Sequence, residues 1–312
     1  MSNSKLSSSL KSLISSPLYP AARAAAGTPR PAGRSASPAP PPATQALSDC
    51  LRRVAGQAEE RGLGWGEWLT ITTATMVTLN SPHSLAHLHR FASPPSGLNL
   101  EQRVERSLLM REVGLKCIGF IGIPKVINNL AALRKAVDED HDLSASLPTE
   151  PRRKIGPNDV GPVQKAARAL WDDIYEPHAA KLIDVLGRSH PDMPVFILDG
   201  EYGPLFSPPH MFRQQGSVEV PSWEVGRVRT SLTALAALRA QGGVGPQVTS
   251  HVYGLIKGAA SIVKGDPHEQ GLRWLTTQEG ASWVLETVSD LSEVVEGGAG
   301  EEHAAKPRES KL

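Results

Sequence analysis

From Leu47 onward, apolar residues recur every three or four positions along the chain, as Leu232, Leu235 and Leu238 do. This spacing matches the 3.6-residue turn of an α-helix and places the apolar side chains on one face. A strand pattern is weak, and residues 195–198 are the only short candidate. The sequence therefore predicts an all-α bundle, with helices at residues 47–61, 65–79, 82–92, 101–119, 124–137, 161–189, 222–241, 246–264 and 276–296.

Two stretches of the chain look like imperfect copies of one unit. The first runs from an apolar helix at 67–79 through a short turn to a helix at 83–92, and the other runs from 229–238 through a glycine turn to 247–256. The second helix of each copy carries a histidine. Because a helical hairpin cannot bury its apolar faces alone, we expect the two copies to pack together. The body is thereby predicted to contain two tandem halves, residues 47–150 and 151–296.

The first 46 residues form a basic leader rich in serine, proline and alanine. No acidic residue precedes Asp49, and Leu6, Leu10 and Ile14 recur at helical spacing beside lysines. A short amphipathic basic helix of this kind is typical of a mitochondrial transit peptide. The alternative is a disordered leader, which the proline-rich run at 29–42 favours. The sequence leaves both alternatives open, and dual targeting is one hypothesis that it supports.

The final residues of the chain, 297–312, are predicted to form a flexible polar tail. They end in Ser310, Lys311 and Leu312, the tripeptide that a peroxisomal import receptor reads at a carboxy terminus. We therefore expect this receptor as a partner and the peroxisome matrix as the location.

Composition excludes several classes of protein. The net charge of +1, with no long lysine or arginine block in the body, gives no sign of a nucleic-acid partner. The longest apolar stretch, residues 69–79, falls short of the roughly 20 residues that a membrane span needs. With Cys50 and Cys117 as the only cysteines, neither a disulfide framework nor a cysteine zinc cluster can form.

Three short segments carry a family resemblance: Arg229 to Leu238 with residues 247–255 around His251, residues 118–128, and residues 171–204. They resemble the Arg-Glu-Leu and histidine helices, the Gly-Phe-Pro-x-x-x-Asn helix start and the Tyr-Gly segment of the carboxymuconolactone decarboxylase and alkylhydroperoxidase D-like (AhpD-like) superfamily. With the terminal tripeptide, the chain is similar to the fungal peroxisomal members. The resemblance implies an AhpD-like bundle of two tandem hairpin units. It also implies a symmetric homodimer, unless the two copies within one chain replace it.

The departures from the family pattern limit the chemistry. The Cys-x-x-Cys pair of the peroxidase branch would fall on Val244 and Gln247, and the glutamate expected after Arg229 is Thr230. Thiolate attack and disulfide release cannot run on valine and glutamine. A proton relay from that glutamate to His251 is missing as well.

His251 is the central candidate for catalysis. Gln247 precedes it by one helical turn, a spacing at which an amide could fix the tautomer of the imidazole. The ring would then serve as a general acid or base facing a pocket between helices. The alternative is a buried structural histidine whose ring is satisfied by a backbone carbonyl.

A second group of candidates lies in the first copy. His83 and His87 stand at i and i+4 on one helix face, a spacing that can hold a divalent metal. No acidic third ligand lies nearby, so we predict no metal site and favour a polar face or a substrate-facing pair.

Cys117, with Glu112 earlier on the same predicted helix and Lys116 between them, is a third candidate. A neighbouring cation could lower the pKa of its thiol and make it reactive. The alternative is a buried core cysteine, the usual environment of this residue.

These observations support one leading function and two alternatives. The leading hypothesis is acid/base chemistry by His251 on a small carbonyl-bearing or peroxide-derived metabolite, without a cofactor. The first alternative is a catalytically silent relative that binds a ligand or partner in the same groove. The second is a single-cysteine thiol peroxidase that uses Cys117 with an external reductant, although no resolving cysteine stands beside it.

Overall fold

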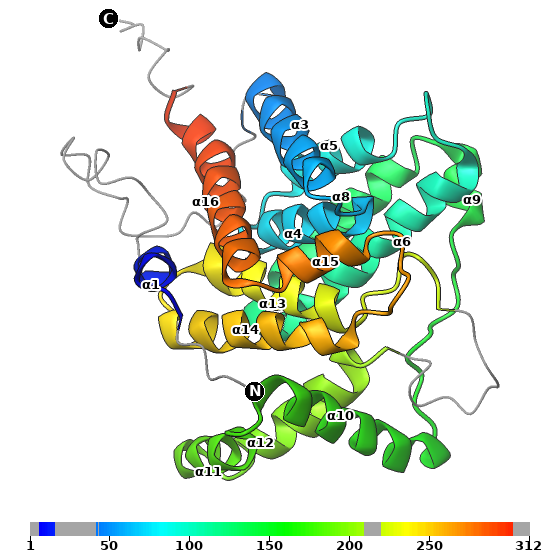
Figure 1. The fold of residues 1–312 in the computed structure, drawn as a ribbon. Helices are drawn as coiled ribbons and strands as arrows, with labels where there is room; N and C mark the ends of the chain where they lie inside the picture. Colours follow the sequence, from blue (N-terminus) through cyan, green and yellow to red (C-terminus); the bar gives the residue numbers. More distant parts are fainter. Residues whose placement is uncertain (1–5, 16–41, 43, 209–219, 302–312) are drawn as a thin grey trace, which may run out of the picture.

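The computed structural model describes residues 6–15, 42, 44–208 and 220–301, and all regular elements in these ranges are helical (Figure 1). The all-α prediction is thereby confirmed for this part of the chain. The strand suggested at 195–198 is wrong, because Val195 ends a short α-helix and residues 196–198 begin a π-helical segment. The first-half helices are α3 (Thr44–Glu60), α4 (Trp65–Thr78), α5 (Pro82–Ala92), α6 (Leu100–Lys116), α7 (Ile118–Ile121), α8 (Ile123–Val137) and α9 (His141–Ser146).

The later helices depart more from the predicted boundaries. The helix predicted at 161–189 is two helices, because Pro177 interrupts the ladder of backbone hydrogen bonds between them. The helix predicted from residue 222 begins five residues later, after a turn that holds Trp223. The later elements are η1 (Pro157–Asp159), α10 (Val160–Tyr175), α11 (Ala179–Ser189), α12 (Met193–Val195), η2 (Phe196–Phe206), α13 (Arg227–Gln241), α14 (Gly245–Lys257), η4 (Gly258–Ser261), α15 (Glu269–Leu275) and α16 (Gln278–Glu301).

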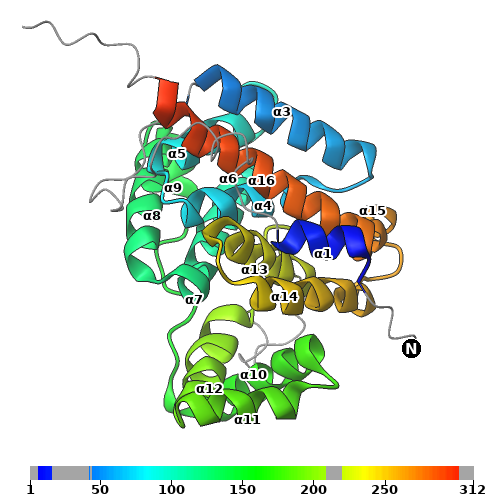
Figure 2. The same ribbon diagram turned by 90° about the vertical axis from the view of Figure 1, so that its left-hand side faces the viewer.

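Helices α4 and α13 lie side by side at the centre of the molecule (Figures 1 and 2). Each is buried on nearly all sides, which explains why alanine, threonine and leucine dominate their sequences. The hydroxyls of Thr70, Thr72 and Thr75 donate hydrogen bonds of 2.7–2.9 Å to carbonyls four residues earlier, so these buried polar groups are satisfied within the helix. Arg229 of α13 donates to Glu67 of α4 at 2.9 Å and joins the two helices at their amino-terminal ends.

Each central helix continues through a short turn into a second helix, α4 into α5 and α13 into α14. Each pair is a helical hairpin, and the two hairpins pack against one another through α4 and α13. The main core contains side chains of both predicted halves, for example Leu69, Leu109 and Leu235. The division at residue 150 therefore does not separate two hydrophobic cores.

A smaller second core lies in the segment between the hairpins. Helices α10, α11 and η2 pack around Trp171, Tyr202 and Phe206 and form the layer at the lower end of Figures 1 and 2. This layer faces α14, the helix that carries His251. A groove between the layer and α14 is the structural setting of the candidate site.

Part of the leader is helical, so the alternative of a leader that is disordered throughout residues 1–46 is wrong for residues 8–15. Residues Ser8–Ser15 form α1, whose apolar side chains Leu6, Leu10 and Ile14 are buried against α14 and α16 (Figure 2). The amide of Ser7 donates to the side chain of Gln278 at 2.7 Å. The predicted amphipathic helix is therefore confirmed, and its apolar face belongs to the main core. At the other end, α16 extends to Glu301, past the predicted start of the tail at residue 297.

Replacing Leu10 with aspartate should release α1 from the protein body. Leu10 is fully buried, and a buried aliphatic side chain contributes about 1.5–3 kcal/mol, while an unpaired carboxylate there would add a large desolvation cost. Hydrogen exchange should show α1 amides becoming unprotected while those of α4 and α13 stay protected. The control is Ser9→Asp, because Ser9 is exposed on the same helix. Unchanged protection of α1 in the Leu10 variant would contradict this packing.

Candidate functional site

His251 lies on α14 where that helix meets the second core. The residue is 7% exposed, and the ring of Phe120 contacts its imidazole edge-on with centroids 5.9 Å apart. Nε2 lies 3.3 Å from the hydroxyl of Tyr175, which in turn lies 2.8 Å from the hydroxyl of Tyr202. An imidazole and two phenols thus form a continuous hydrogen-bonded row inside an aromatic cluster.

The groups of this row are neutral at physiological pH. Burial, with a smaller contribution from the charge of Arg227, lowers the pKa of His251 to about 4. Burial also raises the pKa of Tyr175 and of Tyr202 above the usual value. The neutral imidazole can accept a proton through one nitrogen and donate through the other. Its Nδ1 is buried without a hydrogen-bond partner among the described residues, an unusual and costly state for a ring nitrogen.

A groove of about 570 Å³ opens beside this row, between α11 and α14. Its walls include Tyr175, Ser250 and Tyr253, with Lys181 and Lys257 at the polar side. Lys257 donates to the carbonyl of Ile174 at 2.9 Å and so ties the end of α10 to α14. Tyr175 belongs both to the groove wall and to the buried row, whereas His251 does not line the groove. Tyr175 therefore stands between the groove and the imidazole.

The prediction that Gln247 orients His251 is wrong. Gln247 is exposed on the first turn of α14, and Tyr175 is the residue whose side chain reaches Nε2. The two residues are one helical turn apart as expected, but the side chain of Gln247 is exposed to solvent whereas that of His251 is buried. The partner comes from a different helix that is distant in the sequence.

The histidines of α5 do not form a joint site. His83 is exposed, and half-buried His87 contacts the hydroxyl of Ser48 at 2.8 Å, so the predicted substrate-facing pair is not brought together. His89 is buried and contacts Ser107 at 3.0 Å, and burial lowers its pKa to about 4. Within the described ranges, no group of three or more potential metal ligands occurs.

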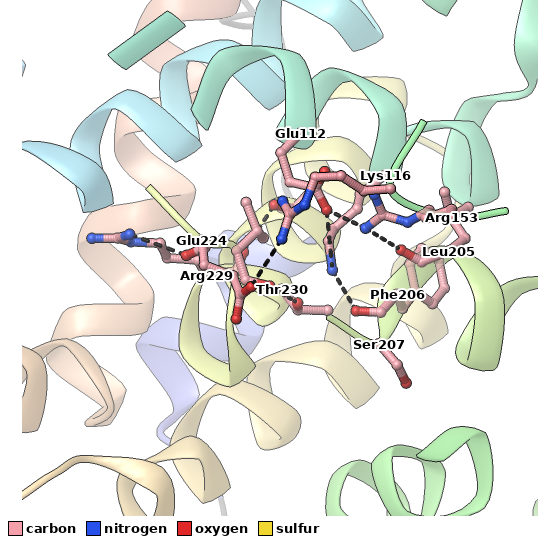
Figure 3. Close-up of polar contacts among 12 residues, drawn as sticks. Glu112, Lys116, Arg153, Leu205, Phe206, Ser207, Glu224, Arg229 and Thr230 are labelled. Carbon is pink, nitrogen blue, oxygen red and sulfur yellow. Dashed lines mark hydrogen bonds and ion pairs between the residues drawn. The ribbon is translucent and has the colours of Figure 1, made fainter. Parts of the chain in front are cut away.

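Cys117 lies in the main core at the end of α6 and is fully buried. Burial raises the pKa of its thiol far above the ordinary value, the opposite of the expected activation. Lys116, the predicted activating cation, points instead to the carbonyl of Phe206 and donates a hydrogen bond to it (Figure 3). The thiol therefore remains protonated at neutral pH.

Glu112 belongs to a buried ionic cluster with Lys116 and Arg153 (Figure 3). Arg153 forms a two-pronged hydrogen bond with the carboxylate, 2.9 Å on one side, and also donates to the carbonyl of Pro204 at 3.0 Å. Burial opposes ionisation of Glu112, but the hydrogen bond from Arg153 and the charge of Lys116 lower its pKa. Burial lowers the pKa of Lys116 to about 7. The cluster fastens the end of η2 to α6.

This fastening fixes the aromatic cluster around His251. The ring of Phe206 stacks on Phe120 with centroids 5.0 Å apart, and it contacts Tyr202 edge-on at 5.2 Å. Because Lys116 and Arg153 hold the backbone at residues 204–206, they position both aromatic neighbours of the row. Glu112 therefore supports the site from behind and does not enter the groove beside His251.

The sequence patterns did not identify Tyr175, Tyr202 or Lys116 as site residues. A signal existed for the lysine, because Lys116 continues the apolar stripe of Leu109 and Val113 along the predicted helix. Tyr175 stands on an amphipathic helix without a motif of its own, and the resemblance of Tyr202 to the Tyr-Gly segment of the family assigned it no role in the site. The three targeting residues, Ser310, Lys311 and Leu312, lie outside the described residues, as does most of the leader.

The chain shows no significant similarity to characterised proteins: no protein-family model matches it, and neither does any curated protein or solved structure. No helix in the described ranges has both the length and the apolar character that a membrane crossing requires.

Proposed function

We propose that this protein is an AhpD-like helical protein of two tandem hairpin units that performs acid/base chemistry on a small carbonyl-bearing or peroxide-derived metabolite. One observation carries the proposal: Tyr175 joins a groove of about 570 Å³ to a neutral, buried His251. Grooves of this volume suit small molecules. The Tyr175 hydroxyl is the catalytic group that touches the substrate, and His251 is a positioning and proton-accepting group behind it.

The hydrogen-bonded row gives the proton a defined course. Tyr175 removes a proton from the substrate carbon beside the carbonyl while it passes its own hydroxyl proton to Nε2 of neutral His251, and both protons return by the same course. Lys181 and Lys257 supply positive charge at the groove for a developing oxyanion. Because burial holds the His251 pKa near 4, the imidazole is unprotonated at neutral pH and holds this proton only transiently.

The location proposed from the sequence accompanies this function. Ser310, Lys311 and Leu312 support the peroxisome matrix, and the basic leader supports an additional mitochondrial address. In the folded chain, the apolar face of α1 is buried, so a receptor for that helix would meet it only before folding or after its release.

The enzymatic proposal is tested by replacing Tyr175 with phenylalanine and His251 with glutamine in the full chain. Carbonyl-bearing metabolites are first screened for a rise in the thermal midpoint, and the stabilising compounds are then followed for turnover by NMR. We expect either substitution to reduce turnover at least about 100-fold, as the loss of a general acid or base typically does. Tyr253→Phe is the matched control, because Tyr253 lines the groove and should not be needed for proton transfer.

One observation favours the silent ligand binder as a second candidate, namely that His251 does not itself line the groove. If compounds bind and none is converted, or if both variants retain full turnover, the acid/base proposal fails. Binding unchanged in both variants would then support the binder. The thiol peroxidase gains no support, because a buried protonated thiol is a poor nucleophile.

A further inference from the structure

A second cavity lies beside α6 and α8, apart from the groove of Tyr175. Its volume is about 460 Å³, and it is enclosed by α6, α8 and the segment at 147–153, with Trp223 at one side. None of its lining residues lines the groove. It is therefore a separate site, although Glu112 and Arg153 of its lining also hold the backbone behind the aromatic cluster around His251.

The walls of this cavity are apolar. Leu108 and Leu115 project from α6, and Leu130 and Leu133 project from α8 at the spacing of one helical face. Leu108, Leu115 and Leu130 are only partly buried, so they are the surface that an apolar ligand would cover. The indole of Trp223 is held over this region by the guanidinium of Arg152, 4.5 Å from the ring centroid.

The polar part of the cavity is positively charged. Four arginines line it, Arg111, Arg134, Arg152 and Arg153, against the carboxylates Glu112 and Glu150. Arg153 pairs with Glu112, Arg152 with Glu224 and Arg134 with Asp138.

Arg111 differs from the other three arginines. Within the described residues it forms no ion pair, and its guanidinium reaches only the carbonyl of Pro148 at 3.3 Å. Glu150 belongs to the same lining but is exposed and does not pair with it. Partial burial of the exposed Arg111 side chain and the neighbouring charge of Arg134 both lower the Arg111 pKa, which indicates two cations that face one space. An anion placed there would relieve that repulsion.

We propose that this cavity binds an amphipathic carboxylate, whose carboxylate group pairs with Arg111 and whose apolar body lies against the leucines of α6 and α8. The planar guanidinium matches a carboxylate in a two-pronged geometry. The volume falls in the range of small-molecule sites. An alcohol or amine with the same apolar body would contact the leucines but would supply no anion to pair with Arg111.

The test uses the full chain, with octanoate as the probe and 1-octanol and octylamine as comparisons, measured by isothermal titration calorimetry. We expect saturable binding of octanoate, at least about tenfold tighter than that of either comparison, since a charge-assisted hydrogen bond is the difference. Arg111→Gln should weaken octanoate at least about tenfold and leave 1-octanol unchanged. Because Arg111 is exposed, this variant should fold like the unmodified protein, which its unfolding midpoint checks.

Two further variants test whether octanoate binds in this cavity or responds only to the loss of an arginine charge elsewhere on the surface. Leu108→Trp should fill the cavity and abolish binding of octanoate, whereas Arg52→Gln removes an exposed arginine of α3 and should have no effect. The proposal is overturned if octanoate does not bind, if octylamine or 1-octanol binds equally well, or if Arg111→Gln leaves octanoate binding unchanged. The proposal is also overturned if inorganic phosphate binds the cavity as tightly as octanoate does, since the apolar body would then contribute nothing to the affinity.

Discussion

A variant with glutamine at both 89 and 251 should retain about 4 kcal/mol more of its stability than the unmodified protein when the pH falls from about 7.5 to about 5. Burial lowers the pKa of each histidine from 6.5 to about 4 in the folded state. The unfolded chain therefore binds protons first as the pH drops below about 6.5. The contribution of each neutral ring to the free energy of unfolding is fully present above pH 6.5 and decreases as the pH approaches the folded pKa. By pH 5 the loss is about 2 kcal/mol per ring.

Urea unfolding at a series of pH values measures this difference. The two proteins must be compared with each other, because other groups also change stability with pH. Burial raises the pKa of Glu201 to about 7, so protonation of this carboxyl stabilises the folded state on acidification, and it does so equally in both proteins. His141→Gln is the control, since the His141 side chain is 95% exposed, and its pH dependence should match that of the unmodified protein. Parallel pH profiles for the double variant and the unmodified protein would show that these rings are not buried and neutral.

Replacing Glu112 with glutamine should lower the free energy of unfolding by about 3 kcal/mol at neutral pH. Removing one partner from a buried ion pair typically costs about 3–5 kcal/mol, because the remaining charge is left without compensation. Arg153 cannot lose its proton, so it retains this cost. Lys116 can, because its pKa is already about 7, which places the expected loss at the lower end of the range.

Glu150→Gln is the matched control for this substitution. Glu150 is exposed near the same cavity, and a surface substitution of this kind changes stability by less than about 0.5 kcal/mol. Urea unfolding with an unchanged slope would attribute the loss in the Glu112 variant to stability alone. A loss below about 1 kcal/mol would mean that Arg153 and Lys116 find other partners or water, and that the cluster does not hold η2 in place.

Much of the helical framework could be predicted from periodicity, and its failures have local causes. The helices at 65–79, 82–92 and 124–137 are found within one residue of their predicted ends. The break at Pro177 is visible in the sequence, since a proline inside a helix removes a donor and clashes with the preceding turn. By contrast, the strand expected at 195–198 rested on a short apolar run, a pattern that does not distinguish a strand from a buried helix.

The candidate site shows where sequence spacing stops being informative. The pairing of His251 with Gln247 followed from positions on one helix, but burial by the neighbouring layer decides which side chain the ring meets. Tyr175 is 76 residues away in the sequence, so no local pattern connects it to His251. Lys116 was expected to lower the pKa of the neighbouring Cys117 thiol through its charge. Its position in an apolar stripe instead indicates a buried amine, which must donate to an acceptor inside the protein, here the carbonyl of Phe206.

The hydrogen bond from Ser7 to Gln278 has a consequence for how the chain is made. Synthesis proceeds from the amino terminus, so α1 and α4 emerge long before α13 and α16, the helices against which they pack. Loop closure over such separations is slow, and the apolar surfaces of the first half stay uncovered meanwhile. A nascent chain halted before residue 278 should therefore be prone to aggregation and chaperone capture, and should become protease-resistant only once its last long helix has left the ribosome.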